Sequence, residues 1–205
     1  MIELYSANTP NGQRAAVALE EFGLPYHLHK VAIFQGGAAT SEFRKINPRE
    51  RIPVIIDPEG PGGRPITLSQ SWAICLYLAE KTGRFVPSDA TGRLEVVQWL
   101  FHLGTDVAAA NTSLNQVSNF VPEKVPSTIS FYEQRFLGVL ANLDQHLGGV
   151  PYFAGDLSVA DFSFYPIYNF RRSLLEKHPE FANLMAWGAR MDKRPACLRG
   201  IQALQ

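Results

Sequence analysis

The sequence contains only two cysteines, Cys75 and Cys197, and they show neither CxxC nor metal-ligand spacing. Two such thiols are too few for a disulfide scaffold, so we expect both to be structural thiols in a reducing compartment. The first residues lack the charged and apolar regions of a secretory signal. No apolar run approaches the roughly 20 residues that cross a bilayer. We therefore expect a cytoplasmic protein with no membrane association.

The chain also lacks an excess of charge of either sign. Its 19 basic and 19 acidic side chains cancel, which leaves no electrostatic footprint for nucleic acid or for a membrane surface. What is present is ordinary for a folded protein, with 46% hydrophobic and 19% charged residues in 205. That length allows one large domain or two small ones, each with a hydrophobic core.

The N-terminal part of the chain alternates β-prone runs with helical patterns. The runs 2–5, 26–31, 54–56 and 66–68 are typical of strands, bounded by turn residues. Helical periodicity follows the first strand up to Gly23 and recurs near 41–46 and 71–81. The order β-α-β-α-β-β-α predicts a small α+β domain at residues 1–83.

Strand signals stop after this region. We place a linker at 84–89 and an all-helical domain at 90–205, with long helices over about 90–112 and 126–147. A further helix is predicted to begin after Ser158, because Asp161 follows at the third helical position and completes a capping box. Leu157 and Phe162 flank this box at the positions of a hydrophobic staple.

Five segments, in this order, resemble the glutathione transferase family and together cover essentially the whole chain. They are Leu4 to Gly12, Asn47-Pro48 with Arg51-Ile52-Pro53-Val54, Leu68 to Leu78, the Ser158/Asp161 segment, and Trp187 to Pro195. The Thr-Pro-Asn-Gly turn at 9–12 is most similar to the nu class of bacteria and fungi, whose members include glutathione-dependent disulfide reductases. The resemblance implies a thioredoxin-like N-terminal domain, an all-α helical-bundle C-terminal domain and a homodimer.

The resemblance also implies which residues bind glutathione as co-substrate. Gln70 and Ser71 would hold the γ-glutamyl carboxylate, where the N-terminus of a helix favours negative charge. Ile52 would precede a cis bond to Pro53 and pair its backbone with the cysteinyl part of glutathione, in the manner of an added strand. Arg51 belongs to the same motif and is assigned to the same site.

The glutathione thiol reacts as a thiolate, and the resemblance assigns its stabilisation to the turn before the first helix. Thr9 and Asn11 rank first for this role, because a hydroxyl and an amide can donate hydrogen bonds to the sulfur. Ser6 ranks next. Tyr5 ranks last, since we expect it to pack within the strand.

Four positions depart from the nu-class pattern. Gln70 stands where a glutamate is usual, and Trp72 replaces a small residue. Phe131 precedes Tyr132 where an arginine would grip a carboxylate of glutathione disulfide, and Ala38 replaces a long polar side chain. We therefore expect weakened binding of glutathione disulfide and a preference for one reduced glutathione with an apolar electrophile.

The predicted function is that of a glutathione transferase-like enzyme with a role in detoxification. It would conjugate the glutathione thiolate to an apolar electrophile, or use the thiolate for exchange with a disulfide co-substrate. Phe101, Asn111, Phe120 and Tyr165 are candidates for the lining of an electrophile pocket against Thr9. The alternative is a non-catalytic regulatory or interaction protein of the same fold, which a thermal shift with reduced and oxidised glutathione would distinguish.

No metal is expected. His27 and His29 share one face of a predicted strand, yet the sequence offers no third ligand near them. We therefore expect both histidines to be exposed or packed.

Overall fold

The computed structural model describes residues 1–32 and 41–205, so the expectation for Ala38 lies outside the described residues. A four-stranded sheet with the order β2-β1-β3-β4 forms the N-terminal part. The central strand β1 (Ile2–Ser6) runs parallel to β2 (Tyr26–Lys30) and antiparallel to β3 (Val54–Asp57). β4 (Ile66–Ser69) pairs antiparallel with β3 after a short 3₁₀ turn, η3 (Pro61–Gly63).

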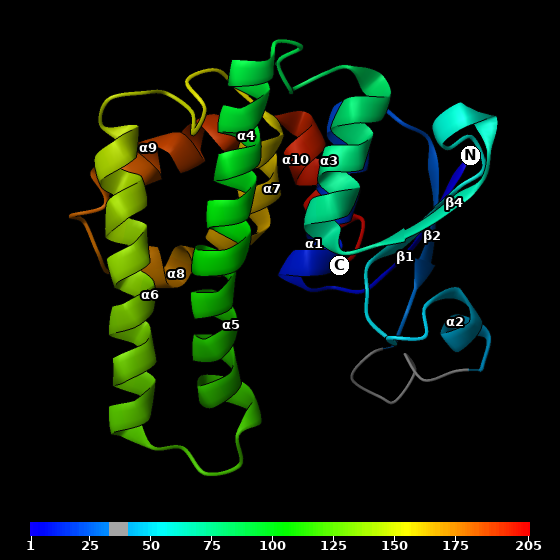
Figure 1. Cartoon of the computed structure of the whole chain (residues 1–205). Helices are drawn as coiled ribbons and strands as arrows, with labels where there is room; N and C mark the ends of the chain where they lie inside the picture. Colours follow the sequence, from blue (N-terminus) through cyan, green and yellow to red (C-terminus); the bar gives the residue numbers. More distant parts are fainter. Residues whose placement is uncertain (33–40) are drawn as a thin grey trace.

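Helices cover both faces of this sheet. α1 (Pro10–Phe22) and α3 (Ser71–Thr82) lie between the sheet and the helical part of the chain, and α2 (Ser41–Ile46) lies on the opposite side (Figure 1). This mixed sheet between two helical layers is the thioredoxin-like arrangement that the resemblance implies. The predicted α+β character of the N-terminal region is confirmed.

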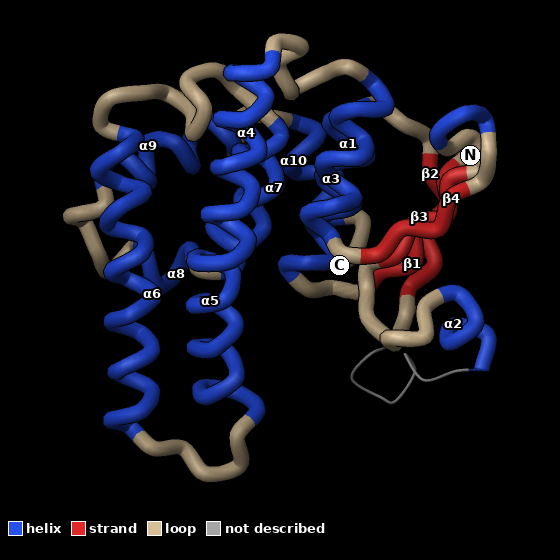
Figure 2. Tube along the Cα trace, viewed as in Figure 1, coloured by secondary structure: helices blue, strands red, loops and turns tan. Residues whose placement is uncertain are grey.

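The remainder of the described chain is helical (Figure 2). A continuous helical run comprises α4 (Ala90–His102), the π-helical turn η4 (Leu103–Val107), α5 (Ala108–Asn115) and a second π-helical turn, η5 (Gln116–Phe120). The predicted helix of about 90–112 is therefore too short. The helix at 126–147 is confirmed as α6 (Pro126–Leu147). The chain then forms α7 (Val159–Phe170), α8 (Arg172–Leu175), α9 (Ala182–Met191) and α10 (Pro195–Gln202).

Helix α1 joins the two parts of the molecule, because it packs against α3, α7 and α10 as well as against the sheet. Its residues are buried almost without interruption from Gly12 to Leu19. Gly12 is required by close packing: a Cβ atom there would lie 2.1 Å from the Ala7 carbonyl oxygen, far inside van der Waals contact. The glycine thus lets α1 begin directly against the end of β1.

The predicted capping box opens α7. The Ser158 hydroxyl accepts a hydrogen bond from the Ala160 N–H, and the Asp161 carboxylate accepts from both the N–H and the hydroxyl of Ser158. The other oxygen of Asp161 accepts from the Phe153 N–H and from the indole N–H of Trp187. Asp161 therefore connects the start of α7 to α9 and to the loop that precedes α7. Its side chain is fully buried.

We expect Asp161→Asn to lower the free energy of unfolding by about 3–6 kcal/mol, because two hydrogen bonds to a charged group are lost at about 1.5–3 kcal/mol each. All four groups that contact the Asp161 carboxylate are hydrogen-bond donors. Asparagine would turn its own NH₂ donor toward two of them, and both of those hydrogen bonds would be lost. Urea unfolding measures the loss. The control is Asp156→Asn, an exposed aspartate in the same segment, which should stay within about 0.5 kcal/mol. Equal stability of the two variants would contradict the structural role of Asp161.

Among the described residues, no helix is both long and apolar enough to span a membrane.

Candidate functional site

The turn between β1 and α1 presents two donors to an open cavity of about 670 Å³. Thr9 is the N-cap of α1, and its Oγ1 accepts the Gly12 N–H at 3.1 Å. Because its oxygen is used as the acceptor of the cap, the Thr9 hydroxyl proton remains a donor. Asn11, at the second helical position, is exposed and lines the same cavity.

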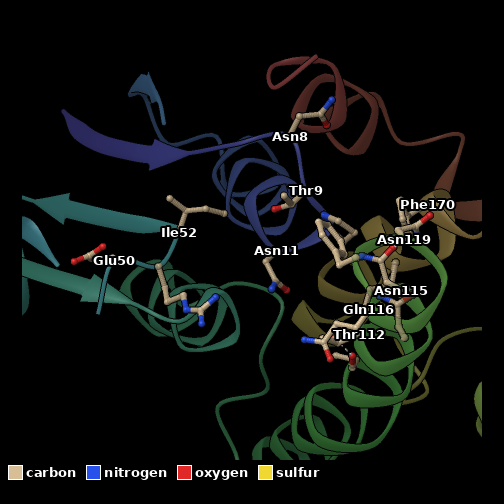
Figure 3. A pocket seen from close by; sticks show the side chains of 16 residues that line it. Asn8, Thr9, Asn11, Glu50, Ile52, Thr112, Asn115, Gln116, Asn119 and Phe170 are labelled. Carbon is tan, nitrogen blue, oxygen red and sulfur yellow. Dashed lines mark hydrogen bonds between the residues drawn. The ribbon is translucent and has the colours of Figure 1, made fainter. Parts of the chain in front are cut away.

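The segment before β3 forms the neighbouring wall. The Ile52–Pro53 bond is cis, as the resemblance implies. Arg51 and Ile52 line the cavity, together with Glu50. Figure 3 shows Ile52 on one side of Thr9 and Asn11, with the side chains of the helical part on the other.

The start of α3 lies behind this turn. Ser71 is the first residue of the helix, and its side chain is buried. Gln70 is the N-cap and is exposed; its backbone has φ 76° and ψ 106°. This conformation is costly for a residue with a Cβ, and such strain is concentrated at functional sites. Neither residue is among those that line the cavity, so the structure brings Thr9, Asn11, Arg51 and Ile52 together and links Ser71 to them indirectly.

That link is Arg14, which the sequence analysis did not identify. Its side chain is fully buried. The Nη1 atom donates to Asn11 Oδ1 at 2.6 Å and to Ser71 Oγ at 2.7 Å, and Nε donates to the Ser163 carbonyl of α7 at 2.6 Å. The guanidinium lies 4.0 Å from the centre of the Trp72 ring, a cation–π distance.

Arg14 carries its charge without an ionic partner. Within the described part of the chain none of its contacts is with a carboxylate, and its Nη2 atom has no hydrogen-bond partner. Burial lowers the pKa of Arg14 to about 10, so the side chain is still charged at neutral pH. The consequence is an unneutralised cation directly behind Asn11 and Ser71. A signal was available in the sequence, because Arg14 is the single charged residue of α1 before Glu20.

The helical wall of the cavity is a stripe of neutral polar side chains. Asn111, Asn115 and Asn119 recur every fourth residue and so lie on one face of α5 and η5. Thr112 and Gln116 extend this face, and all five line the cavity (Figure 3). Asn111 is held by Arg171, whose Nε donates to Asn111 Oδ1 at 2.7 Å. Asparagine is a poor helix former, so three at this spacing are a signal present in the sequence, and only Asn111 of the three is among the pocket candidates.

Two of the four candidates for the lining of an electrophile pocket lie at the cavity. Asn111 and Phe120 line the cavity. Tyr165 does not line it, because its side chain is buried and its hydroxyl donates to Asp192 at 2.8 Å. Phe101 lies on the surface of α4 and is also absent from the lining. Apolar contacts come instead from Ile167 and Phe170 of α7.

The two lower-ranked candidates of the turn are not brought to the cavity. Ser6 is fully buried, and a Cβ at Gly12 would lie 2.6 Å from its Oγ, so the hydroxyl faces the start of α1. Tyr5 packs on the outer face of the sheet, stacked on His29 with ring centres 4.3 Å apart. The placement of Ser6 differs from the sequence-based expectation, because the end of β1 is covered by α1.

Both cysteines are buried and free. Burial raises the pKa of the Cys75 thiol to about 11 and also raises that of Cys197. Neither thiol lines the cavity. Both are therefore protonated at neutral pH and lie away from the turn that presents Thr9 and Asn11.

The family of the chain follows from its similarity to known proteins. Residues 9–81 match the family described as "Glutathione S-transferase, N-terminal domain". The chain is 36% identical to the disulfide-bond oxidoreductase YfcG of Escherichia coli, over 96% of this chain and 92% of that protein. The chain belongs to the glutathione transferase family.

Two solved structures of glutathione transferases are similar to the chain over nearly its whole length. A glutathione transferase family member from Pseudomonas fluorescens, with two glutathiones bound, has a TM-score of 0.90 and 32% identity, and the match covers 98% of this chain and 92% of that one. A glutathione transferase from Pseudomonas putida, with one glutathione disulfide bound per subunit, has a TM-score of 0.88 and 31% identity, covering 98% and 90%.

Proposed function

We propose that the protein is a glutathione-dependent thiol–disulfide oxidoreductase built on the transferase fold. The observation that carries this proposal is the contact between Arg14 and Asn11. Because the Asn11 oxygen accepts from Arg14, the Asn11 amide turns its NH₂ group away from Arg14 and toward the cavity. Beside it, the Thr9 hydroxyl is also a donor. The turn thus offers two donors, backed by a buried cation, to a thiolate.

The same cation supports the proposed role of Ser71. Its oxygen accepts from Arg14, so its hydroxyl proton is available to a ligand carboxylate at the start of α3. The backbone N–H groups there add the positive end of the helix dipole. In this proposal Gln70, Ser71, Arg51 and Ile52 hold glutathione, and Thr9 and Asn11 hold its sulfur.

The chemistry supplied by glutathione is thiol–disulfide exchange. Its thiolate attacks one sulfur of a disulfide co-substrate, the S–S bond breaks, and the leaving thiolate takes up a proton. A second glutathione thiolate resolves the mixed disulfide, which gives glutathione disulfide and a second reduced thiol. The protein keeps the attacking sulfur ionised and oriented, and no protein cysteine takes part.

The amide-rich wall of α5 and η5 favours a peptide-like co-substrate over a purely apolar electrophile. Five neutral side chains that can both donate and accept hydrogen bonds suit peptide groups. Some are already paired within the wall, as Asn119 is with Asn115 and Thr112 with the Ala108 carbonyl, but an apolar electrophile would leave the remaining donors and acceptors without partners. The relatives with two glutathiones or glutathione disulfide bound support the same conclusion. Conjugation to an electrophile is the second candidate function, favoured by Phe120, Ile167 and Phe170 in the lining.

Competing assays test this choice. With glutathione in excess, we expect a larger kcat/KM for a small disulfide, such as hydroxyethyl disulfide, than for a halogenated nitrobenzene. The reverse order would assign the cavity to conjugation. A protein that binds neither form of glutathione in a thermal-shift assay would instead be a non-catalytic member of the family. The cytoplasmic location and the homodimer remain part of the proposal.

We expect Ser71→Ala to weaken the binding of reduced glutathione by about 1.5–3 kcal/mol, as for loss of a hydrogen bond to a charged group. Calorimetry measures the affinity. The control is Ser69→Ala, two residues earlier and outside the helix, which should bind normally. Unchanged affinity of a folded Ser71→Ala protein would remove Ser71 from the site.

A further inference from the structure

Three potential metal ligands converge on the outer face of the sheet, and none of them lines the cavity. Glu3 lies in β1, His27 and His29 lie in β2, and the parallel register sets Glu3 opposite His27. Ile2 and Leu4 of β1 are buried in the core, so alternation directs Glu3 to the other face. The expectation that the two histidines lack a third ligand is therefore wrong, because strand pairing supplies one from a distant part of the sequence.

The ligand atoms already lie close to the separations of a zinc site. Glu3 Oε2 is 3.2 Å from His27 Nδ1 and 2.5 Å from His29 Nε2, and the three atoms all lie within 4.8 Å of one another. Bonds of about 2.0–2.2 Å to tetrahedral zinc place neighbouring ligand atoms roughly 3.3–3.5 Å apart. The His27 pair matches this separation, and the His29 pair has to open by roughly 1 Å to admit the ion.

The surroundings of the three side chains allow this movement. The His29 ring is stacked on Tyr5 with an interplanar angle of 10°, which fixes the direction of its Nε2 atom. Glu3 and His27 are freer, with 35% and 64% of their side chains exposed. One ligand is thus held in place, two can move, and solvent reaches the remaining coordination position.

We infer that Glu3, His27 and His29 form a binding site for one zinc ion, with water completing the coordination. Two imidazoles and a carboxylate are donors that suit zinc and its borderline neighbours. The site lies on the face of the N-terminal sheet that α2 covers in part, and it does not depend on the proposed glutathione chemistry.

The test is a zinc titration of the full protein after removal of adventitious metal with a chelator. Calorimetry should give saturable binding of one ion. In nuclear magnetic resonance spectra, the imidazole signals of His27 and His29 should shift together at one equivalent, while those of His102, His146 and His178 stay in place. Absence of saturable binding, or shifts of the other histidines at the same equivalent, would overturn the inference.

Two variants sharpen the result. Glu3→Gln and His29→Ala should each weaken zinc binding at least about tenfold, since even changes outside the ligand set commonly cost 10–100-fold. The control is His102→Ala. His102 lies in α4, with its Nδ1 atom 2.7 Å from the Asp106 carboxylate, and this variant should bind zinc as the parent does. Equal affinity of all the variants would assign the ion to some other place. The wild-type spectra decide the matter if a variant fails to fold.

Discussion

Asn11→Leu is expected to lower glutathione-dependent turnover about 10- to 150-fold, the equivalent of the 1.5–3 kcal/mol of one hydrogen bond to a charged group. The same loss should raise the pKa of the bound glutathione thiol by about 1–2 units, because each unit corresponds to 1.36 kcal/mol. The sign follows from the role of Asn11: a donor to the thiolate favours the charged form, so its removal favours the protonated form.

Asn11→Asp separates this role from simple packing. Aspartate keeps an acceptor for Arg14, so it preserves that contact. It replaces the NH₂ group with a negative charge beside the sulfur, however, and like charges disfavour ionisation. We expect turnover below that of Asn11→Leu. The matched control is Asn8→Leu, another exposed asparagine that lines the cavity from the same turn, and it should stay near the parent. An Asn11→Asp enzyme as active as the parent would contradict the proposed donor.

Arg14→Met is expected to lower activity while it leaves stability nearly unchanged. The buried guanidinium has no carboxylate partner in the described part of the chain, and its lowered pKa of about 10 means that folding disfavours its charged form. The corresponding cost is about 3 kcal/mol. Loss of the guanidinium removes this cost, but it also leaves the Ser163 carbonyl and the Ser71 hydroxyl without their donor, at about 1–3 kcal/mol each. Urea unfolding should therefore show a free energy of unfolding close to that of the parent.

Activity should fall in the same variant. Without Arg14, the Asn11 amide and the Ser71 hydroxyl lose the donor that orients both, so we expect kcat/KM for glutathione to drop by at least about tenfold. Arg14→Lys keeps the charge but has a single donor centre in place of the fork, and it should recover only part of the activity. A stable Arg14→Met enzyme with normal kinetics would show that Arg14 only fills space.

The pH dependence of wild-type stability provides a separate check on Arg14. Its folded pKa lies below the ordinary value, so the cost of burying the charge applies fully at pH below about 10. That cost is relieved as the pH rises from about 10 toward the unfolded value, and this contribution therefore increases stability in that window. The contribution should be missing from Arg14→Met.

Local patterns in the sequence predicted much of the fold. The strand and helix order of the first domain follows from alternating periodicities, and the capping box at Ser158 follows from spacing within four residues. Pro126 at the first turn and the glycine pair after Leu147 mark the ends of α6. The helix from Ala90 was predicted too short, because the part beyond residue 112 comprises the end of α5 and the π-helical turn η5 and contains asparagines that disfavour helix.

The site was less predictable, because it depends on contacts between distant segments. Thr9, Asn11 and Ile52 were predicted as site residues from motifs, and these motifs do not show which neighbouring side chains are buried. Arg14 would ordinarily lie on the exposed face of a helix, but α1 is enclosed by the sheet, α3, α7 and α10. Its connection of Asn11 to Ser71 spans two helices. The convergence of Glu3 on His27 and His29 likewise depends on strand register, which two short strands do not reveal in sequence.

The central claim is that the turn at Thr9 and Asn11 ionises the thiol of bound glutathione without help from a protein cysteine. The direct measurement is the ultraviolet thiolate absorbance of bound glutathione against pH in a Cys75→Ala/Cys197→Ala protein. We expect the bound thiol to have the same pKa as in the parent protein, below the ordinary value of about 8.5. Turnover should be retained, apart from modest losses from the cavity that Cys75→Ala creates. Thr9→Ala and Asn11→Leu in the same background should raise this pKa. An inactive cysteine-free protein, alongside normal activity of the Thr9→Ala and Asn11→Leu variants that keep both cysteines, would contradict the account.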